Sequence, residues 1–100
     1  AHITGGGIED NVLRIVPKAC NISIQSEIWD VPPIFPFLQQ AGRIADSEMK
    51  RTFNNGIGMI AVVPEQATSE VVERLHGEWI AFLRDHGAPE ARVFELRCYA

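Results

Sequence analysis

Two patterns of apolar and polar positions along the chain are typical of β-strands. In residues 20–25 and 92–98, apolar and polar residues alternate, which places the apolar side chains on one face of a half-buried strand. Residues 57–63 form an uninterrupted apolar run, which is typical of a central strand covered on both faces. Residues 2–4 have the composition of a strand end. Together with the three segments above, they give four predicted strands.

A third pattern has the period of an α-helix. Ile8, Val12 and Ile15 are spaced i, i+4 and i+7 and therefore share one face of a helix over residues 8–16. Pro17 ends that helix because proline cannot continue it. The helices predicted in this way span residues 8–16, 34–40, 47–53 and 69–84.

Turn-forming and capping residues set the ends of the later helices. Gly42 is expected to cap the end of the second helix, Asp46 the start of the third and Thr68 the start of the fourth. Gly77 weakens the middle of the fourth helix. The apolar stripe expected on this helix consists of Val72, Leu75, Trp79, Phe82 and Leu83.

The order of these elements is strand, helix, strand, two helices, strand, helix, strand. It predicts an α/β (α+β) fold in which helices pack against a mixed sheet. One hundred residues suffice for one domain with one hydrophobic core. A glycine-rich loop usually follows a strand, and only four residues precede the glycines here. We therefore expect that strand to begin upstream of Ala1, so that residues 1–100 are one part of a longer protein.

Composition excludes some partners. The net charge of −4 argues against nucleic acid or an anionic membrane as a general partner, because both require a basic surface. No apolar run approaches the roughly 18 residues of a membrane span, and no signal peptide is visible, so we expect a cytoplasmic protein. Cys20 and Cys98 are interpreted as structural thiols, and the dispersed histidines predict no metal site.

The glycine loop, Gly5-Gly6-Gly7, carries the clearest chemical signal. Glycine adopts positive φ without a steric penalty, so consecutive glycines can turn several backbone N–H groups toward one point. The start of a helix adds unpaired N–H groups, and the two features together can bind an anion, most often a phosphate. A simple turn before a helix explains the same residues, and the sequence leaves both interpretations open.

Several polar residues stand near this loop or at a second turn. His2 and Thr4 could donate to the same anion, or could simply pack at a strand end. Asn11 projects from the first helix. Asn54 and Asn55 belong to a strong turn signal, which we expect at the same end of the sheet as the glycine loop. Our predicted substrate- and phosphate-binding residues are His2, Thr4, Gly5, Gly6, Gly7, Asn11, Asn54 and Asn55, and no catalytic residue is predicted.

A set of motifs in residues 1–65 resembles one known family. The motifs are residues 1–7 (AHITGGG), Asn11, Arg14, Pro17, Trp29, and residues 31–35 (VPPIF), 38–39 (LQ), 48–49 (EM) and 51–59 (RTFNNGIGM). They resemble the C-terminal part of AIR synthetase, the phosphoribosylformylglycinamidine cyclo-ligase of purine biosynthesis. The resemblance implies that residues 1–100 are a single, partial C-terminal domain and that the N-terminal ATP-binding domain is absent.

The resemblance also implies an activity. The family enzyme uses ATP and Mg²⁺ to close an imidazole ring on a phosphorylated substrate. Under this hypothesis the chain is inactive alone, binds no cofactor itself, and has the missing N-terminal portion as its partner within a cytoplasmic homodimer. The alternative hypothesis is a non-catalytic anion-binding or structural domain of the same fold.

Overall fold

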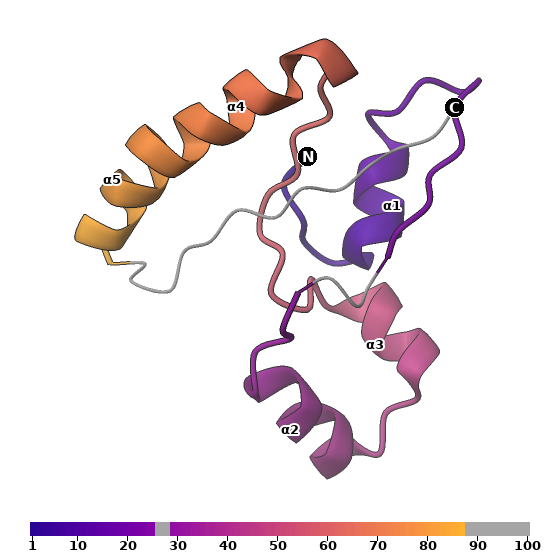
Figure 1. Ribbon diagram of the computed structural model, residues 1–100. Helices are drawn as coiled ribbons and strands as arrows, with labels where there is room; N and C mark the ends of the chain where they lie inside the picture. Colours follow the sequence, from indigo (N-terminus) through magenta and orange to yellow (C-terminus); the bar gives the residue numbers. More distant parts are fainter. Residues whose placement is uncertain (26–28, 88–100) are drawn as a thin grey trace.

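The computed structural model describes residues 1–25 and 29–87, in which short helices are joined by extended segments (Figure 1). The glycine loop leads into α1 (Gly7–Leu13), and a long connection leads to α2 (Ile34–Gly42) and α3 (Asp46–Thr52). A second extended segment then reaches a final helical stretch. This stretch consists of the 3₁₀ turn η2 (Glu65–Ala67), α4 (Thr68–Arg74), the π-helical turn η3 (Leu75–Trp79) and α5 (Ile80–Asp85).

The predicted mixed sheet is wrong for the described residues, which contain no strand. Their only β-pairing is an isolated antiparallel bridge between His2 and Met59. The Ile3 N–H donates to the Gly58 carbonyl oxygen at 2.9 Å beside that bridge. Two segments of this length do not make a stable sheet, because three or more strands with a shared apolar face are needed. Residues 20–25 form no bridge with any described residue, and the strand predicted at residues 92–98 lies outside the described part of the chain.

The helices lie where they were predicted, but their ends differ. α1 ends at Leu13. Ile15 and Val16 follow in turns, and the N–H groups of both residues donate to the Val12 carbonyl oxygen. α2 includes Gly42, and the left-handed residue after it is Arg43, with φ 50°. Asp46 is the first residue of α3 rather than its cap. Its carboxylate accepts a hydrogen bond from the Gln39 side chain and so links α3 to α2.

The apolar stripe of the last helix is correct only as far as Leu75, the first residue of the π-helical turn. Val72 is half-buried, but Trp79 is 58% exposed and Ile80 is 6% exposed instead. Gly77 lies in the middle of η3, where its weak helix propensity favours such a distortion. A π-bulge adds one residue to the helix and so turns the following positions by about 100°. The buried face therefore shifts from the predicted stripe to Ile80.

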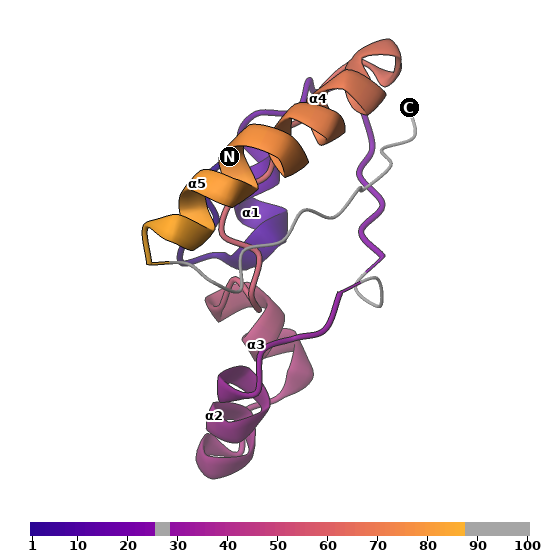
Figure 2. The same ribbon diagram turned by 60° about the vertical axis from the view of Figure 1, so that its left-hand side comes forward.

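The hydrophobic core packs α1 and the segment before it against Trp29 and Ile57. Its buried members are Ile3, Ile8, Val12, Trp29 and Ile57. α1 packs against α3, and α3 contacts α2, partly through an edge-to-face pair of Phe35 and Phe53 with ring centroids 5.8 Å apart. In both views α1 and α2 lie on different sides of α3 (Figure 2). Among the described helices, α4 and α5 do not contact α1, α2 or α3. The packing of α1 against α3 therefore positions the glycine loop at α3.

Candidate anion-binding site

The glycine loop is a tight turn with left-handed residues. The Gly7 N–H donates to the Thr4 carbonyl oxygen at 3.2 Å, which closes the turn. Gly6 has φ 99° and Gly7 has φ 67°, a region that residues with a Cβ rarely adopt. Two of the three glycines are therefore required by the backbone itself. Gly5 has no positive φ, and its missing Cβ would meet no atom within 4 Å.

Gly7 also permits close contact with α3. A Cβ at Gly7 would overlap the Lys50 carbonyl oxygen and would lie 3.4 Å from the Phe53 carbonyl oxygen. The loop can therefore rest directly on the C-terminal end of α3 only with glycine at this position. This contact was not predicted, because it involves main-chain atoms whose position the residue types do not reveal.

Asn11 holds the loop from within α1. Its Nδ2 donates to the carbonyl oxygen of Gly7 at 2.7 Å and to those of Thr4 and Gly5, each at 3.3 Å. Its Oδ1 accepts from Thr4 Oγ1 at 3.4 Å and from the Arg14 guanidinium at 3.3 Å. With 4% of its surface exposed, Asn11 is the buried polar residue of this part of the fold. All of its hydrogen-bonding capacity is used around the loop.

The Asn54-Asn55-Gly56 turn lies beside the same end of α3. Asn55 has φ 50°, and its Nδ2 donates to the carbonyl oxygens of Met49 and Phe53, both at 3.4 Å. Asn54 Oδ1 accepts from the Gly56 N–H at 3.0 Å, as in an Asx turn. Both the glycine loop and this turn therefore contact the C-terminal end of α3, which brings together residues more than forty positions apart. The sequence predicted that the two turns share one end of a sheet; in the described residues there is no sheet, and both turns lie at α3 instead.

Trp29 links the second turn to the core. Its indole Nε1 donates to the Asn55 carbonyl oxygen at 3.0 Å, while its ring is buried in the core cluster. At Gly56, with φ 98°, a Cβ would lie 2.5 Å from Pro32 Cδ. These contacts tie the turn at Asn55 to the core and to the segment that precedes α2.

Ile3 is buried in the core, but the polar residues on either side of it are exposed. His2 and Thr4 are both exposed, and Thr4 directs its hydroxyl to Asn11. Asp10 lies beside Gly6, since a Cβ at Gly6 would be 3.1 Å from the Asp10 carboxylate. This negative charge opposes an anion in the loop, while the Arg14 guanidinium hydrogen bonds to Asn11.

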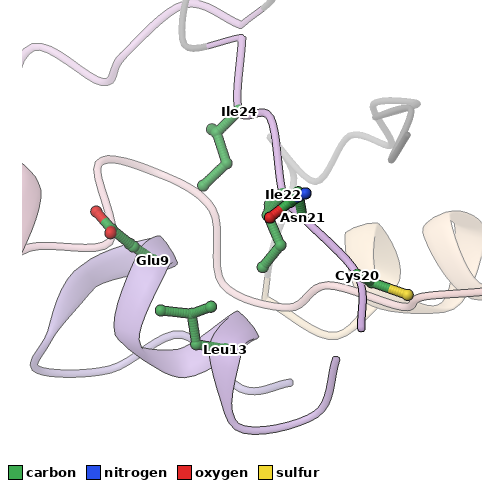
Figure 3. A pocket seen from close by; sticks show the side chains of 6 residues that line it. All are labelled: Glu9, Leu13, Cys20, Asn21, Ile22 and Ile24. Atoms are coloured by element: carbon green, nitrogen blue, oxygen red, sulfur yellow. The ribbon is translucent and has the colours of Figure 1, made fainter. Parts of the chain in front are cut away.

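A separate groove lies between α1 and residues 20–24 (Figure 3). It has a volume of about 320 Å³ and is lined by Glu9, Leu13, Cys20, Asn21, Ile22 and Ile24. Leu13, Ile22 and Ile24 point into the space between the helix and the extended segment, as Figure 3 shows. Among the described residues that line the groove, Glu9 is the charged one, so the groove is less suited to a phosphate than the loop.

The family of the chain is established by comparison with known proteins. Residues 1–82 match the family described as AIR synthase related protein, C-terminal domain. The chain belongs to this family. The match begins at residue 1 and therefore includes the glycine loop, α1, α2 and α3.

Curated relatives of the AIR synthase family carry one enzyme name. The chain is 48% identical over 83 residues to a chloroplastic phosphoribosylformylglycinamidine cyclo-ligase of Arabidopsis thaliana, which is 82% of this chain and 21% of the relative. It is 52% identical over 77 residues to the cyclo-ligase of Citrifermentans bemidjiense, or 77% of this chain and 22% of that protein. The cyclo-ligase of Desulfatibacillum aliphaticivorans is 53% identical over 73 residues, or 73% and 21%. The chain thus spans about a fifth of the length of these relatives.

Two further properties bear on ligands of this AIR synthase domain. Within residues 1–25 and 29–87, no three His, Cys, Asp or Glu side chains lie close enough together to hold a metal ion. Of the helices in the same residues, none is long and apolar enough to cross a bilayer.

Proposed function

We propose that this chain forms the C-terminal part of a phosphoribosylformylglycinamidine cyclo-ligase, an ATP-dependent enzyme of purine biosynthesis. The observation that carries the proposal is identity near 50% to cyclo-ligases from a plant and from bacteria, over about three quarters of the chain. The share of each relative covered, 21% to 22%, supports a larger enzyme in which other segments complete the active site.

In this proposal the glycine loop binds a phosphate group of the substrate or of the nucleotide. The amide N–H groups of Gly5 and Gly6 form no hydrogen bond within residues 1–25 and 29–87, so they are available to a ligand. His2 is exposed next to them and adds an imidazole as a further donor, while the single hydroxyl donor of Thr4 is directed at Asn11 Oδ1. Donors of this kind fit the oxygens of a phosphate, and they stabilise negative charge without changing position.

The second turn faces a different part of the substrate. We assign Asn54 or Asn55 to the amide or formyl end of the phosphorylated amidine. The Asn55 hydrogen bonds to Met49 and Phe53 are long, at 3.4 Å, so its side chain can exchange them for a ligand at little cost. Because both turns rest on α3, one rigid element would set the distance between the phosphate and the reacting group.

ATP, with Mg²⁺, would transfer its terminal phosphoryl group to the formyl oxygen and leave as ADP, and closure of the ring by the amidine nitrogen would release that oxygen as inorganic phosphate. We place the ATP-binding domain, and the ligands of Mg²⁺, in the remainder of the enzyme. The residues of this chain bind and orient the phosphorylated substrate and form one wall of the cleft. We further propose that the complete enzyme is a homodimer and acts in the cytoplasm.

The test is a ring-closure assay on the complete enzyme that contains these residues. Aminoimidazole ribonucleotide and ADP are measured with the formylglycinamidine substrate, ATP and Mg²⁺. We expect one ADP for each ring formed by the complete enzyme, and no turnover by residues 1–100 alone. Absence of ring closure by the complete enzyme, at saturating ATP and substrate, would reject the proposed activity.

A further inference from the structure

We infer that residues 61–63 form a docking edge, whose backbone binds the segment that directly precedes Ala1 in the complete enzyme. The two segments pair as antiparallel strands and extend the short pairing between residues 1–3 and 58–60. The occupant of the edge is therefore another part of the same polypeptide. The docking edge shares with the proposed function only the requirement for a larger enzyme, and it has no part in the reaction.

The register of this pairing is set by the hydrogen bonds beside the bridge between His2 and Met59. Ala1 and Ile60 form a hydrogen-bonded pair. The Ala1 nitrogen donates to the Ile60 carbonyl oxygen at 2.6 Å, and the Ile60 N–H donates to the Ala1 carbonyl oxygen at 2.9 Å. In antiparallel strands such pairs recur at every second residue. The next pair therefore joins Val62 to the residue two positions before Ala1.

The backbone of the docking edge is free to form this pair. Neither the N–H nor the carbonyl group of Val62 has a hydrogen-bond partner within residues 1–25 and 29–87. The pairing ends after Val62, because the next hydrogen-bonding position is Pro64, which has no N–H. Exposed strand edges are usually protected by charged side chains, but residues 57–63 carry no charge. The edge thus has the properties of a surface that another strand covers.

The side chains of this segment also favour a covering strand. Met59 is 71% exposed and Val62 is 44% exposed, although both are apolar. Ala1 and Ile60, which form the observed hydrogen-bonded pair, pack against the hydrophobic core. Side chains two positions apart share one face of a strand, so a residue paired with Val62 extends this packed face and covers Val62. Contact with the core stabilises a pairing of two strands, which is only marginally stable by itself.

The lengths of the relatives support an occupant from the same polypeptide. The matched family is described as a C-terminal domain, and the chain spans 21% to 22% of three cyclo-ligases. Residues 1–3 run antiparallel to residues 58–60, with the N-terminus beside this segment (Figure 1). A chain that continues upstream in the same direction therefore runs along residues 61–63. A second copy of the chain, or a distant segment of the enzyme, would have to reach the same register without this continuity.

The first test is hydrogen–deuterium exchange of the unmodified complete enzyme, resolved to single amides. We expect the Val62 amide to exchange at least about a hundredfold more slowly than in an unstructured peptide of the same sequence, because exchange of a paired amide requires local opening. Exchange of Val62 at the unstructured rate would overturn the inference. This measurement requires no substitution, so its result does not depend on the folding of a variant.

The second test is a disulfide cross-link in the complete enzyme, with Cys20 and Cys98 replaced by serine. Ala61 and the residue directly before Ala1 form the expected non-hydrogen-bonded pair, whose Cβ atoms lie about 4.5–5.5 Å apart. Ala61→Cys is therefore combined with a cysteine at that upstream position. Val63→Cys with the same upstream cysteine is the matched control, because this diagonal pair is about 7–8 Å apart. We expect the Ala61→Cys pair to form its disulfide about tenfold faster than the control, since disulfides require close Cβ atoms.

The location of the cross-link distinguishes the occupants of the edge. A disulfide between two polypeptides would assign the edge to a second copy and overturn the inference. Equal rates for the two cysteine pairs, or a protected Val62 without a cross-link, would assign the edge to a distant segment and also overturn it. Ring closure is measured separately. An enzyme that closes the ring but forms no cross-link retains the proposed activity and loses the docking edge, whereas a cross-linked enzyme without ring closure shows the reverse.

Discussion

Replacing Gly7 with alanine perturbs the loop and the helix packing together. The new Cβ would have to occupy φ 67°, and it would overlap the Lys50 carbonyl oxygen at the end of α3. Left-handed backbone costs a residue with a Cβ about 1–2 kcal/mol. Forcing packed elements apart costs about 1–3 kcal/mol more. We therefore expect Gly7→Ala to lower the free energy of unfolding by about 2–5 kcal/mol, a large share of the 5–15 kcal/mol of a typical domain.

Urea unfolding followed by tryptophan fluorescence measures this loss, because Trp29 is buried in the same core as α1. Gly5→Ala is the matched control in the same loop. Gly5 has no positive φ and open space around its missing Cβ, so its change is expected to stay within about 0.5 kcal/mol. If Gly7→Ala and Gly5→Ala unfold with equal free energies, the contact between the loop and α3 does not limit stability, and the reasoning from steric overlap is refuted.

Two further substitutions test the second turn and the last helix. Trp29→Phe removes the 3.0 Å hydrogen bond to the Asn55 carbonyl oxygen but keeps most of the buried ring. We expect a loss of about 1–2 kcal/mol in urea unfolding followed by circular dichroism, and an unchanged midpoint would show that this bond contributes nothing. Gly77→Ala replaces the central residue of η3 with a better helix former. We expect the free energy of unfolding to rise by up to about 1 kcal/mol, and a decrease would contradict the view that Gly77 weakens this helix.

The sequence predicted local features of this fold better than its long-range pairing. The prediction that Ile8 and Val12 share one face of a helix was correct, because the 3.6-residue period and the turn residues act over a few positions. The mixed sheet was wrong, since strand patterns do not specify their partners, and Met59 pairs only with His2 in the described residues. The exposed Trp79 shows the same limit within a helix, because a single π-helical turn displaces every later position.

In the candidate site, the sequence predicted the shape of the turn but not the contacts that hold it. Glycine clusters predict a tight left-handed turn, and Gly6 and Gly7 form one. Residue types do not reveal that Asn11 folds back onto three carbonyl groups, because an asparagine on a helix more often faces solvent. Nor do they reveal that the Lys50 carbonyl lies against Gly7, since main-chain contacts leave no mark in composition.

The most direct test of the central claim is a structure of the complete enzyme with its phosphorylated substrate and a non-hydrolysable ATP analogue. The claim predicts a phosphate oxygen at hydrogen-bonding distance, about 2.7–3.2 Å, from the amide nitrogens of Gly5 and Gly6. A structure in which every phosphate of both ligands is bound by other segments, with water on these two amides, would contradict it.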